Sequence, residues 1–397
     1  MLGTVHTACA CYIQIMERAD VVVIGGGPAG STCAGRLRDG GLDVLVLDKA
    51  QFPRPKLCAG WITPAVLDEL DLSASRYAEG RVLQPMTGFR IGRIGGPSLV
   101  VRYSQPVSFG IRRIELDDYL LRRSGARLHL GDPAKAIRRS GKQWIVNERF
   151  ETPMLVAAGG HFCPVARLLG LAAGGHGPVI ASQEIEFELS AAQQAACPVD
   201  PQVPELYFCE DLLGYGWCIR KGNYLNVGLG RADPRRLPAH VADFCRYLAR
   251  EGRTAGPLPA RFQGHAYLLY EQSSRPLLDD GVVWLGDAAG LAYPQSGEGI
   301  RPAIESGLLA ADTILEAQGD YRRERLELYR RRLETRFGPR AAQSPGVPPP
   351  SALHRRLAGW LLGRRWFVRH ILLERWFFHN HEPAIDLPCR NPAPGVR

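Results

Sequence analysis

The residues with the clearest chemical meaning are three glycines near the N-terminus. Gly25, Gly27 and Gly30 fit the spacing GxGxxG, and they directly follow an apolar run at residues 21–24. Glycines so spaced allow a tight turn, let the backbone approach a pyrophosphate, and let the next helix pack against the strand. The first free N–H groups of that helix then face the phosphates. The stretch therefore predicts a phosphate-binding turn.

An acid follows this turn at the distance that a dinucleotide site requires. A second apolar run at residues 42–47 ends at Asp48, where a carboxylate can accept a hydrogen bond from a ribose 2′-hydroxyl. The order strand, glycine turn, helix, strand, acid is much more specific than the glycine spacing alone. A free carboxylate would repel a 2′-phosphate, so NADP is disfavoured at this position.

A second glycine-containing stretch lies about 250 residues later in the chain. Residues 282–285 form another apolar run, and Gly286 and Asp287 follow it. Gly297 and Gly299 then precede a segment with helical periodicity. Its apolar face would consist of Ile300, Ala303, Ile304, Leu308 and Ala311.

Together these stretches resemble the flavoprotein family with the p-hydroxybenzoate hydroxylase fold. The resemblance implies that Asp287 binds the ribityl chain of FAD and that Gly297 and Gly299 place N–H groups beside the flavin ring. It also implies that Arg113, four residues before Asp117 at the start of a helix, contacts the cofactor. The predicted FAD contacts are Gly25, Gly27, Ala29, Gly30, Asp48, Lys49, Arg54, Cys58, Arg113, Asp287, Gly297, Gly299 and Ile300.

Within this family, residues 52–70 resemble the geranylgeranyl reductases. That group has a basic turn leading to a cysteine beside the flavin, matched here by Arg54, Lys56 and Cys58. The sequence departs from the group at Ala59 and Trp61. Buried packing is the alternative interpretation of Cys58.

Residues 212–230 carry a second match to the same group, whose pattern is YxWxFPKG followed by NVG. Tyr215 and Trp217 are kept, as are Lys221, Gly222 and the triplet 226–228, whereas Ile219 and Arg220 replace Phe-Pro. Flavin-dependent halogenases have a related motif here. Cys58, Tyr215 and Trp217 are the predicted catalytic residues, with core packing as the alternative for the two aromatics. No residue is predicted to bind a metal.

One departure bears on the electron donor. Most members of the resembled family have Ala-Asp-Gly where this chain has Ala158, Gly159 and Gly160. The missing Asp weakens the case for direct reduction by NAD(P)H. A flavin reductase or a ferredoxin-like acidic protein is the alternative donor, since the net charge of +9 would attract it.

The order of these elements predicts an α/β protein in which two domains are interleaved. A Rossmann-like FAD-binding domain would comprise residues 18–75, 110–170 and 275–340. A substrate domain with an antiparallel sheet would comprise 76–109 and 171–274, with strands near 88–94, 99–103, 180–189 and 224–229. An N-terminal tail would cover residues 1–17, and a helical segment 341–397.

The C-terminal segment is rich in Trp, Phe, Leu and Arg between residues 354 and 379. Plotted as one helix, its arginines do not separate from its apolar residues, as an interfacial helix requires. We therefore expect helices that roof an apolar pocket, with peripheral membrane contact as the alternative.

Composition excludes several classes of function. Among 397 residues the ten cysteines are scattered, without a zinc-site or disulfide pattern. The first 300 residues contain no basic tract dense enough to indicate nucleic-acid binding. No apolar run reaches the length of a membrane span. Without a basic N-terminal region before an apolar stretch, a secretory signal is not expected, which favours the cytoplasm.

These observations predict an FAD-dependent oxidoreductase. By its resemblance it would reduce C=C bonds of an isoprenoid or another apolar substrate by hydride transfer from reduced flavin. The alternative is a flavin-dependent monooxygenase or halogenase acting on an aromatic or polyketide-like substrate. A flavin-binding protein without turnover is the third hypothesis.

Overall fold

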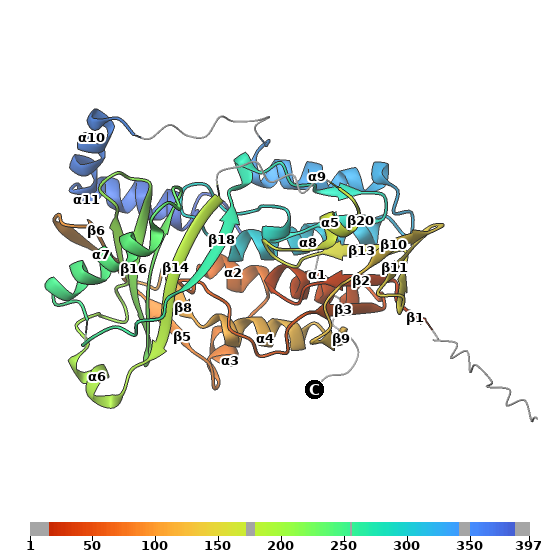
Figure 1. The fold of residues 1–397 in the computed structure, drawn as a ribbon, viewed down its shortest axis with the longest axis horizontal. Helices are drawn as coiled ribbons and strands as arrows, with labels where there is room; N and C mark the ends of the chain where they lie inside the picture. Colours follow the sequence, from red (N-terminus) through yellow and green to blue (C-terminus); the bar gives the residue numbers. More distant parts are fainter. Residues whose placement is uncertain (1–15, 172–178, 255, 341–349, 386–397) are drawn as a thin grey trace, which may run out of the picture.

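The computed structural model describes residues 16–171, 179–254, 256–340 and 350–385. Two large sheets form its framework, and helices pack against both (Figure 1). The predicted N-terminal tail lies outside the described residues up to residue 15. Residues 341–349 and 386–397 of the predicted C-terminal segment lie outside them as well.

The first large sheet carries the glycine-rich turn. Its strand order is β19-β20-β13-β2-β3-β9, and all neighbours are parallel except β19 and β20. Strands β2 and β3 are buried on both faces, which explains why their sequences are continuously apolar. The bounds are β2 Val21–Ile24, β3 Val44–Asp48, β9 Arg127–Leu130, β13 Met154–Ala157, β19 Leu278–Asp279 and β20 Val282–Trp284.

Helices α1 (Pro28–Asp39) and α8 (Ile300–Glu316) pack closely against each other. The five predicted apolar positions of α8 are all buried, but the helix is not one-sided, because Arg301 and Glu305 are buried too. The guanidinium Nε of Arg301 lies 3.1 Å from Glu69 Oε1 and 2.9 Å from Glu305 Oε1. Such pairing allows a charged residue in a protein interior.

The second large sheet has the order β18-β14-β17-β16-β15-β6-β7 and is antiparallel except between β15 and β6. Helix α7 (Leu237–Arg250) covers one face, where Phe244 packs on Val227 and Leu229. Alternate residues therefore point to the opposite face. The bounds are β6 Gly88–Arg93, β7 Ser98–Arg102, β14 Val179–Glu188, β15 Glu205–Phe208, β16 Gly214–Lys221, β17 Tyr224–Arg231 and β18 Gln263–Leu268, and they include the four predicted strands.

Two small sheets complete the strands. One contains β4 (Trp61–Ile62), β8 (Ser108–Ile111) and β5 (Leu83–Met86), and the other contains β1 (Glu17–Arg18), β12 (Phe150–Thr152), β11 (Gln143–Val146) and β10 (Ile137–Ser140). The three-stranded sheet joins segments that the predicted division assigns to different domains. The domain limits therefore stay a prediction.

Several shorter helical elements connect the sheets. They are α2 Pro64–Glu69, α3 Ala74–Ala78, α4 Arg113–Arg123, α5 Val165–Leu168, α6 Ala191–Ala196, η1 Tyr270–Gln272 and η2 Gly286–Ala288. Helix α9 (Arg323–Phe337) packs on α8.

The C-terminal segment divides into elements that behave differently. The π-helix η3 (Val368–Phe377) buries Leu372, Leu373 and Phe377 in a cluster with Trp61 and Trp217. Helix α10 (Ala352–Leu362) buries only Leu362, and α11 (Arg365–Phe367) links the two. A helix long and apolar enough to span a bilayer does not occur in the described ranges.

Candidate active site

A pair of hydrogen bonds fixes Asp48 beside the glycine-rich turn. The backbone N–H of Gly26 donates to Asp48 Oδ2 over 2.7 Å, and that of Ala50 donates to Oδ1 over 2.8 Å. A carboxylate has about four acceptor positions. Asp48 therefore keeps capacity for the ribose hydroxyl that its place in the sequence predicts.

Gly27 and Gly30 of the turn are glycines for different structural reasons. A Cβ added to Gly30 would lie 1.9 Å from the carbonyl oxygen of Gly25, so the close approach of α1 to the turn requires glycine there. A Cβ added to Gly27 would meet only the Arg54 side chain, at 3.5 Å. The space around Gly27 is therefore available to a ligand.

A cavity of about 790 Å³ extends from this turn to the seven-stranded sheet. Its volume is in the range of natural small-molecule sites. It brings together every predicted site residue except Gly30, which packs behind it. These residues are Gly25, Gly27, Ala29, Asp48, Lys49, Arg54, Cys58, Arg113, Tyr215, Trp217, Asp287, Gly297, Gly299 and Ile300.

Two helices begin in the wall of this cavity. Helix α1 follows Gly27 and α8 follows Gly299, and no side chain caps either N-terminus. Uncapped N–H groups and the positive end of the helix dipole favour negatively charged or oxygen-rich groups. A pyrophosphate at α1 and the ring oxygens of a flavin at α8 fit these two ends.

A buried cation also faces the cavity. Arg113 is 9% exposed, and Asp117 binds its guanidinium through two hydrogen bonds of 2.7 and 2.9 Å. Arg54 Nη1 lies 3.3 Å from the same carboxylate, so two positive charges share one negative charge. The expectation that Asp117 opens the helix is wrong, because Arg113 opens α4 and Asp117 follows one turn later.

Comparison with known proteins agrees with this geometry. The family model described as "FAD binding domain" matches residues 18–337. The chain belongs to this family. FAD is therefore its cofactor.

Relatives of this FAD-dependent enzyme include named reductases. Menaquinone reductase of Mycobacterium tuberculosis (strain ATCC 25618 / H37Rv) is 31% identical over 329 residues, which are 76% of this chain and 78% of the relative. Digeranylgeranylglycerophospholipid reductase of Methanocaldococcus jannaschii is 28% identical and covers 80% and 83%. The predicted likeness to the geranylgeranyl reductases is confirmed.

Solved structures confirm the predicted fold class. A geranylgeranyl bacteriochlorophyll reductase-like protein from Thermoplasma acidophilum superposes with a TM-score of 0.71 at 23% identity, covering 87% of this chain and 88% of that one. A flavin-dependent brominase gives a TM-score of 0.61 at 19% identity, covering 79% and 83%. At these identities the likeness concerns the fold alone.

The open face of the seven-stranded sheet forms the other wall of the main cavity. Tyr215 and Trp217 on β16 point to this side, as predicted from their spacing by two. The sheet also brings in residues that were not predicted from the sequence: Ser182 and Glu184 on β14, and His265 and Tyr267 on β18. The sequence signal that could have indicated the β14 residues is the alternation of the polar residues Ser182, Glu184 and Glu186 along the strand.

The stretch with Cys58 is tied to this sheet through its backbone. The Cys58 N–H donates to Glu184 Oε1, and the Cys58 carbonyl accepts a hydrogen bond of 3.1 Å from Asn226 Nδ2. Asn226 also accepts the indole N–H of Trp217 over 2.7 Å. The two stretches that resemble geranylgeranyl reductases are therefore parts of one hydrogen-bonded wall.

Replacing Cys58 with serine tests the predicted position beside the flavin. The thiol lines the cavity and interacts with Arg113, so Cys58→Ser should shift the flavin absorption spectrum and change turnover per bound FAD. FAD occupancy should stay near wild type, and unfolding free energy should fall by about 1 kcal/mol. Spectroscopy and turnover on FAD-normalised samples measure this. Identical spectra and turnover would mean that Cys58 only packs.

Charged side chains gather around Asp287. Lys56 Nζ lies 3.0 Å from His265 Nε2, which lies 3.8 Å from Asp287 Oδ2. Burial, and then the Lys56 charge, lower the pKa of His265 to about 4. Burial, with help from Arg113, also lowers the pKa of Lys56. His265 is therefore neutral at pH 7, and its Nε2 lies within hydrogen-bond distance of Lys56 Nζ.

Glu184 is a buried acid in the sheet wall of the cavity. It is 3% exposed, and burial raises its pKa to about 7, although Lys221 and the Cys58 N–H oppose the shift. Its Oε1 accepts the Cys58 N–H, which leaves Oε2 to carry a proton. A carboxyl group that exchanges a proton near neutral pH is suited to general acid catalysis.

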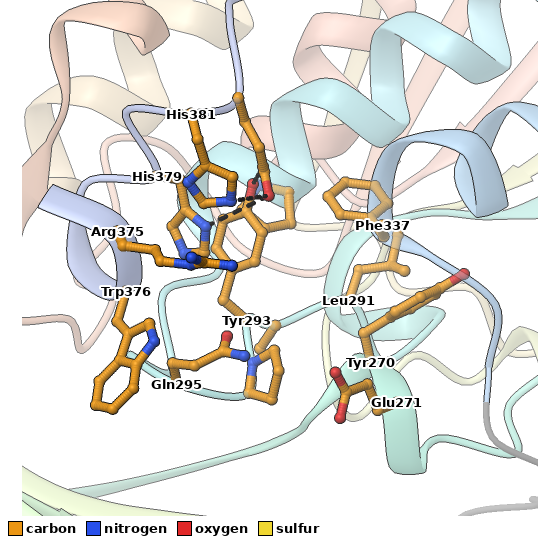
Figure 2. Close-up of a pocket in the computed structure, with 14 residues that line it drawn as sticks. Tyr270, Glu271, Leu291, Tyr293, Gln295, Phe337, Arg375, Trp376, His379 and His381 are labelled. Carbon is orange, nitrogen blue, oxygen red and sulfur yellow. Dashed lines mark hydrogen bonds and ion pairs between the residues drawn. The ribbon is translucent and has the colours of Figure 1, made fainter. Parts of the chain in front are cut away.

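A second cavity of about 250 Å³ lies beside the loop that precedes Gly297 (Figure 2). The His379 ring stacks on Tyr293, with centroids 3.7 Å apart. The Tyr293 hydroxyl donates to Glu382 Oε2 over 3.0 Å. These contacts attach residues 379–382 of the C-terminal segment to the loop that leads to Gly297 in the main cavity.

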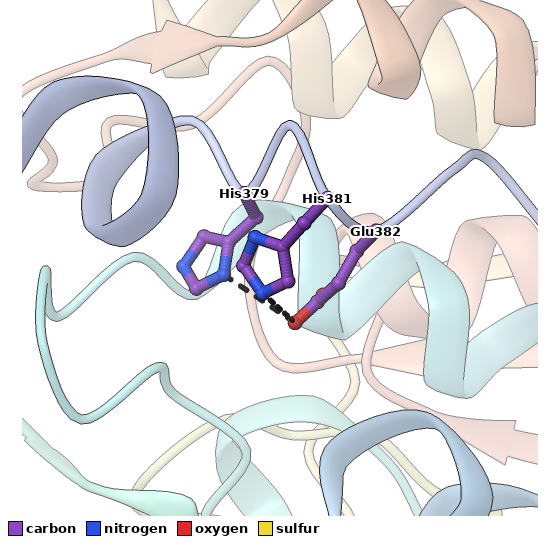
Figure 3. Close-up of side chains that lie close together, drawn as sticks. All are labelled: His379, His381 and Glu382. Carbon is purple, nitrogen blue, oxygen red and sulfur yellow. Dashed lines mark ion pairs between the residues drawn. The ribbon is translucent and has the colours of Figure 1, made fainter. Parts of the chain in front are cut away.

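Figure 3 shows His379, His381 and Glu382 turned toward one another, and their potential ligand atoms lie within 4.8 Å. This cluster was not predicted from the sequence. Arg336 Nη2 lies 4.0 Å from Glu382 Oε2, and Arg301 donates to the Glu382 carbonyl over 2.8 Å. Two permanent positive charges disfavour a cation here. We interpret the cluster as a brace for the C-terminal segment.

Proposed function

We propose that this FAD-dependent oxidoreductase reduces C=C bonds of an isoprenoid or another apolar substrate. The observation that carries the proposal is the protonatable Glu184, which lies with Tyr215 and Trp217 in the sheet wall of the cavity. The relatives named as reductases of menaquinone and of digeranylgeranylglycerophospholipid support a reductive role.

The proposed reduction needs one hydride and one proton. Reduced flavin, when bound, would supply the hydride to one carbon of the alkene and would be oxidised. Glu184 supplies the proton to the other carbon, and its carboxylate regains a proton from solvent. The remaining wall residues orient the alkene and exclude water.

Glu184 is a better proton source than the predicted Tyr215. The Tyr215 hydroxyl already donates to the Ser296 carbonyl over 2.6 Å, and burial raises its pKa well above 10. Trp217 is likewise engaged through its indole N–H. We propose that these two aromatics shape the wall and that Cys58 acts at the flavin edge.

The candidate electron donors are NAD(P)H, a flavin reductase and a ferredoxin-like protein. Gly159 lines the cavity at the position where the family resemblance implies an Asp. The positive net charge supports an acidic protein donor.

Anaerobic reoxidation tests the proposed reaction. The flavin is reduced with dithionite, and a geranylgeranyl lipid is then added without oxygen. The flavin absorption should recover as the alkene takes the hydride, and a saturated product should appear by mass spectrometry.

A monooxygenase or halogenase would give a different time course. Its flavin would stay reduced until oxygen is admitted, and an oxygenated or halogenated aromatic product would then form. That result with several polyprenyl lipids would overturn the proposed reduction and leave the FAD-binding fold unaffected.

A further inference from the structure

Helix α10 presents an apolar face to solvent. Leu353, Leu357 and Trp360 are 75%, 51% and 56% exposed, and their spacing of four and three residues places them on one side of the helix. Trp366, in the adjoining α11, is 66% exposed. Four of the five large apolar side chains that are exposed in the described residues therefore lie within one short stretch.

The opposite side of α10 holds the helix on the protein. Leu362 is buried in the apolar cluster that contains Trp61 and Trp217, both of which line the FAD cavity. A Cβ added to Gly359 would lie 2.8 Å from Arg93 Nη1, so this side approaches β6 closely. The exposed apolar face is thus a second face, separate from the one used for folding.

Arginines are numerous in the stretch that carries the exposed face. Residues 351–373 contain Arg355, Arg356, Arg364, Arg365 and Arg369 and no Asp or Glu. This stretch therefore carries five of the nine net positive charges of the chain. The first four of these arginines are exposed, and the Arg364 guanidinium lies over the Trp360 ring at 4.5 Å. Tryptophan and arginine with apolar anchors are typical of a membrane–water interface.

We propose that α10 and α11 form a docking surface for an anionic lipid bilayer, made by Leu353, Leu357, Trp360 and Trp366 with their flanking arginines. The apolar side chains would enter the acyl boundary, and the arginines would bind lipid phosphates. The surface lies beyond residue 337, where the match to the FAD family ends. It rests on the proposed function in that an isoprenoid lipid would reach the cavity from the membrane.

The charge pattern favours a membrane over a second copy of the chain. A symmetric dimer through this face would place the same arginines opposite one another. Anionic phosphates supply the complementary charge. Figure 1 shows α10 at one end of the molecule, where a flat surface can reach it.

The distribution of arginines and apolar residues, plotted for the whole segment as one helix, did not reveal the apolar face of α10. Plotted as one helix, residues 354–379 mix the exposed side of α10 with the buried side of η3. The helical structure is interrupted at Gly363 and Arg364, after the end of α10. The two elements therefore have different orientations.

Co-sedimentation of the FAD-loaded full chain with vesicles tests the proposal. Vesicles of phosphatidylcholine with about 30% phosphatidylserine should bind the protein, and pure phosphatidylcholine should bind it about tenfold more weakly or less. The triple variant Leu353→Ser, Leu357→Ser, Trp360→Ser should lose about tenfold or more in binding. Retained FAD in the variant shows that it is folded.

A charge-matched pair of variants separates the docking surface from net charge. Arg355→Glu with Arg356→Glu should abolish binding to anionic vesicles. Lys135→Glu with Lys142→Glu makes the same change in net charge on exposed residues around the β10–β11 hairpin, at the other end of the molecule, and should bind as wild type. Quenching of tryptophan fluorescence by brominated lipid, reduced in Trp360→Phe, is a second measurement.

Three outcomes would overturn the docking surface. They are no binding of the wild type to anionic vesicles, unchanged binding of the triple variant, and a dimer without vesicle binding that the triple variant dissociates. Vesicle binding is measured without turnover. Its failure is therefore distinguishable from a failure of alkene reduction.

Discussion

Replacing Glu184 with glutamine should slow reduction of the C=C bond by about 10²- to 10⁴-fold, the usual contribution of a general acid. Glutamine keeps an oxygen that can accept the Cys58 N–H, so the wall and the bound FAD should persist. It removes the proton that the proposed reaction needs. Single-turnover reoxidation of reduced flavin by the alkene measures this step directly.

The pH dependence of the same step gives an independent readout. The pKa of Glu184 is raised to about 7, so the protonated acid is present below that pH and is lost as the pH rises through it. Alkene reduction by the wild type should therefore fall above pH 7, whereas Glu184→Gln should lack this limb. Glu184→Asp, which restores a carboxyl group, should recover part of the rate and the limb.

Reduction of the flavin by its electron donor serves as the control for these variants. It should be unchanged in Glu184→Gln, because the donor step does not use this proton. A glutamine variant that reduces the alkene at the wild-type rate would exclude Glu184 as the acid.

Replacing Gly27 with valine should weaken FAD binding by about a hundredfold or more. The added side chain would occupy the space at the start of α1 where the pyrophosphate is expected, and loss of two charge-assisted hydrogen bonds costs about 3 kcal/mol or more. The protein itself offers room, since the nearest atom is Arg54 Nη2. The FAD content of purified protein and titration of apoprotein with FAD measure the effect.

Gly30 supplies the matched comparison. Gly30→Ala would force its Cβ against the Gly25 carbonyl and should lower the stability of the whole domain. Gly27→Val should instead unfold near the melting temperature of wild-type apoprotein. Full FAD occupancy in Gly27→Val would show that the pyrophosphate does not bind at this turn.

The local parts of the site could be predicted from the sequence. The turn from β2 to α1 and the acid Asp48 depend on backbone conformation and on short spacings, so their residue types are informative wherever they occur. The same holds for Tyr215 and Trp217, whose spacing by two places them on one face of a strand. The spacing of Arg113 and Asp117 was read from the sequence, but their hydrogen bonds across one turn of α4 were found only in the structure.

The tertiary structure alone decided which groups meet at the proposed reaction centre. Lys56, Glu184 and His265 are far apart in sequence, and only the pairing of β14 with β18 and the docking of the Cys58 stretch on β14 bring them together. The pKa of Glu184 depends on burial that no local pattern expresses. The exposed face of α10 could not be predicted from the sequence either, because the direction of its side chains depends on where one helix ends and the next begins. Short-range spacing thus determined the glycine-rich turn and Asp48. Long-range packing determined the surroundings of the proposed acid Glu184 and the exposure of the proposed docking surface on α10.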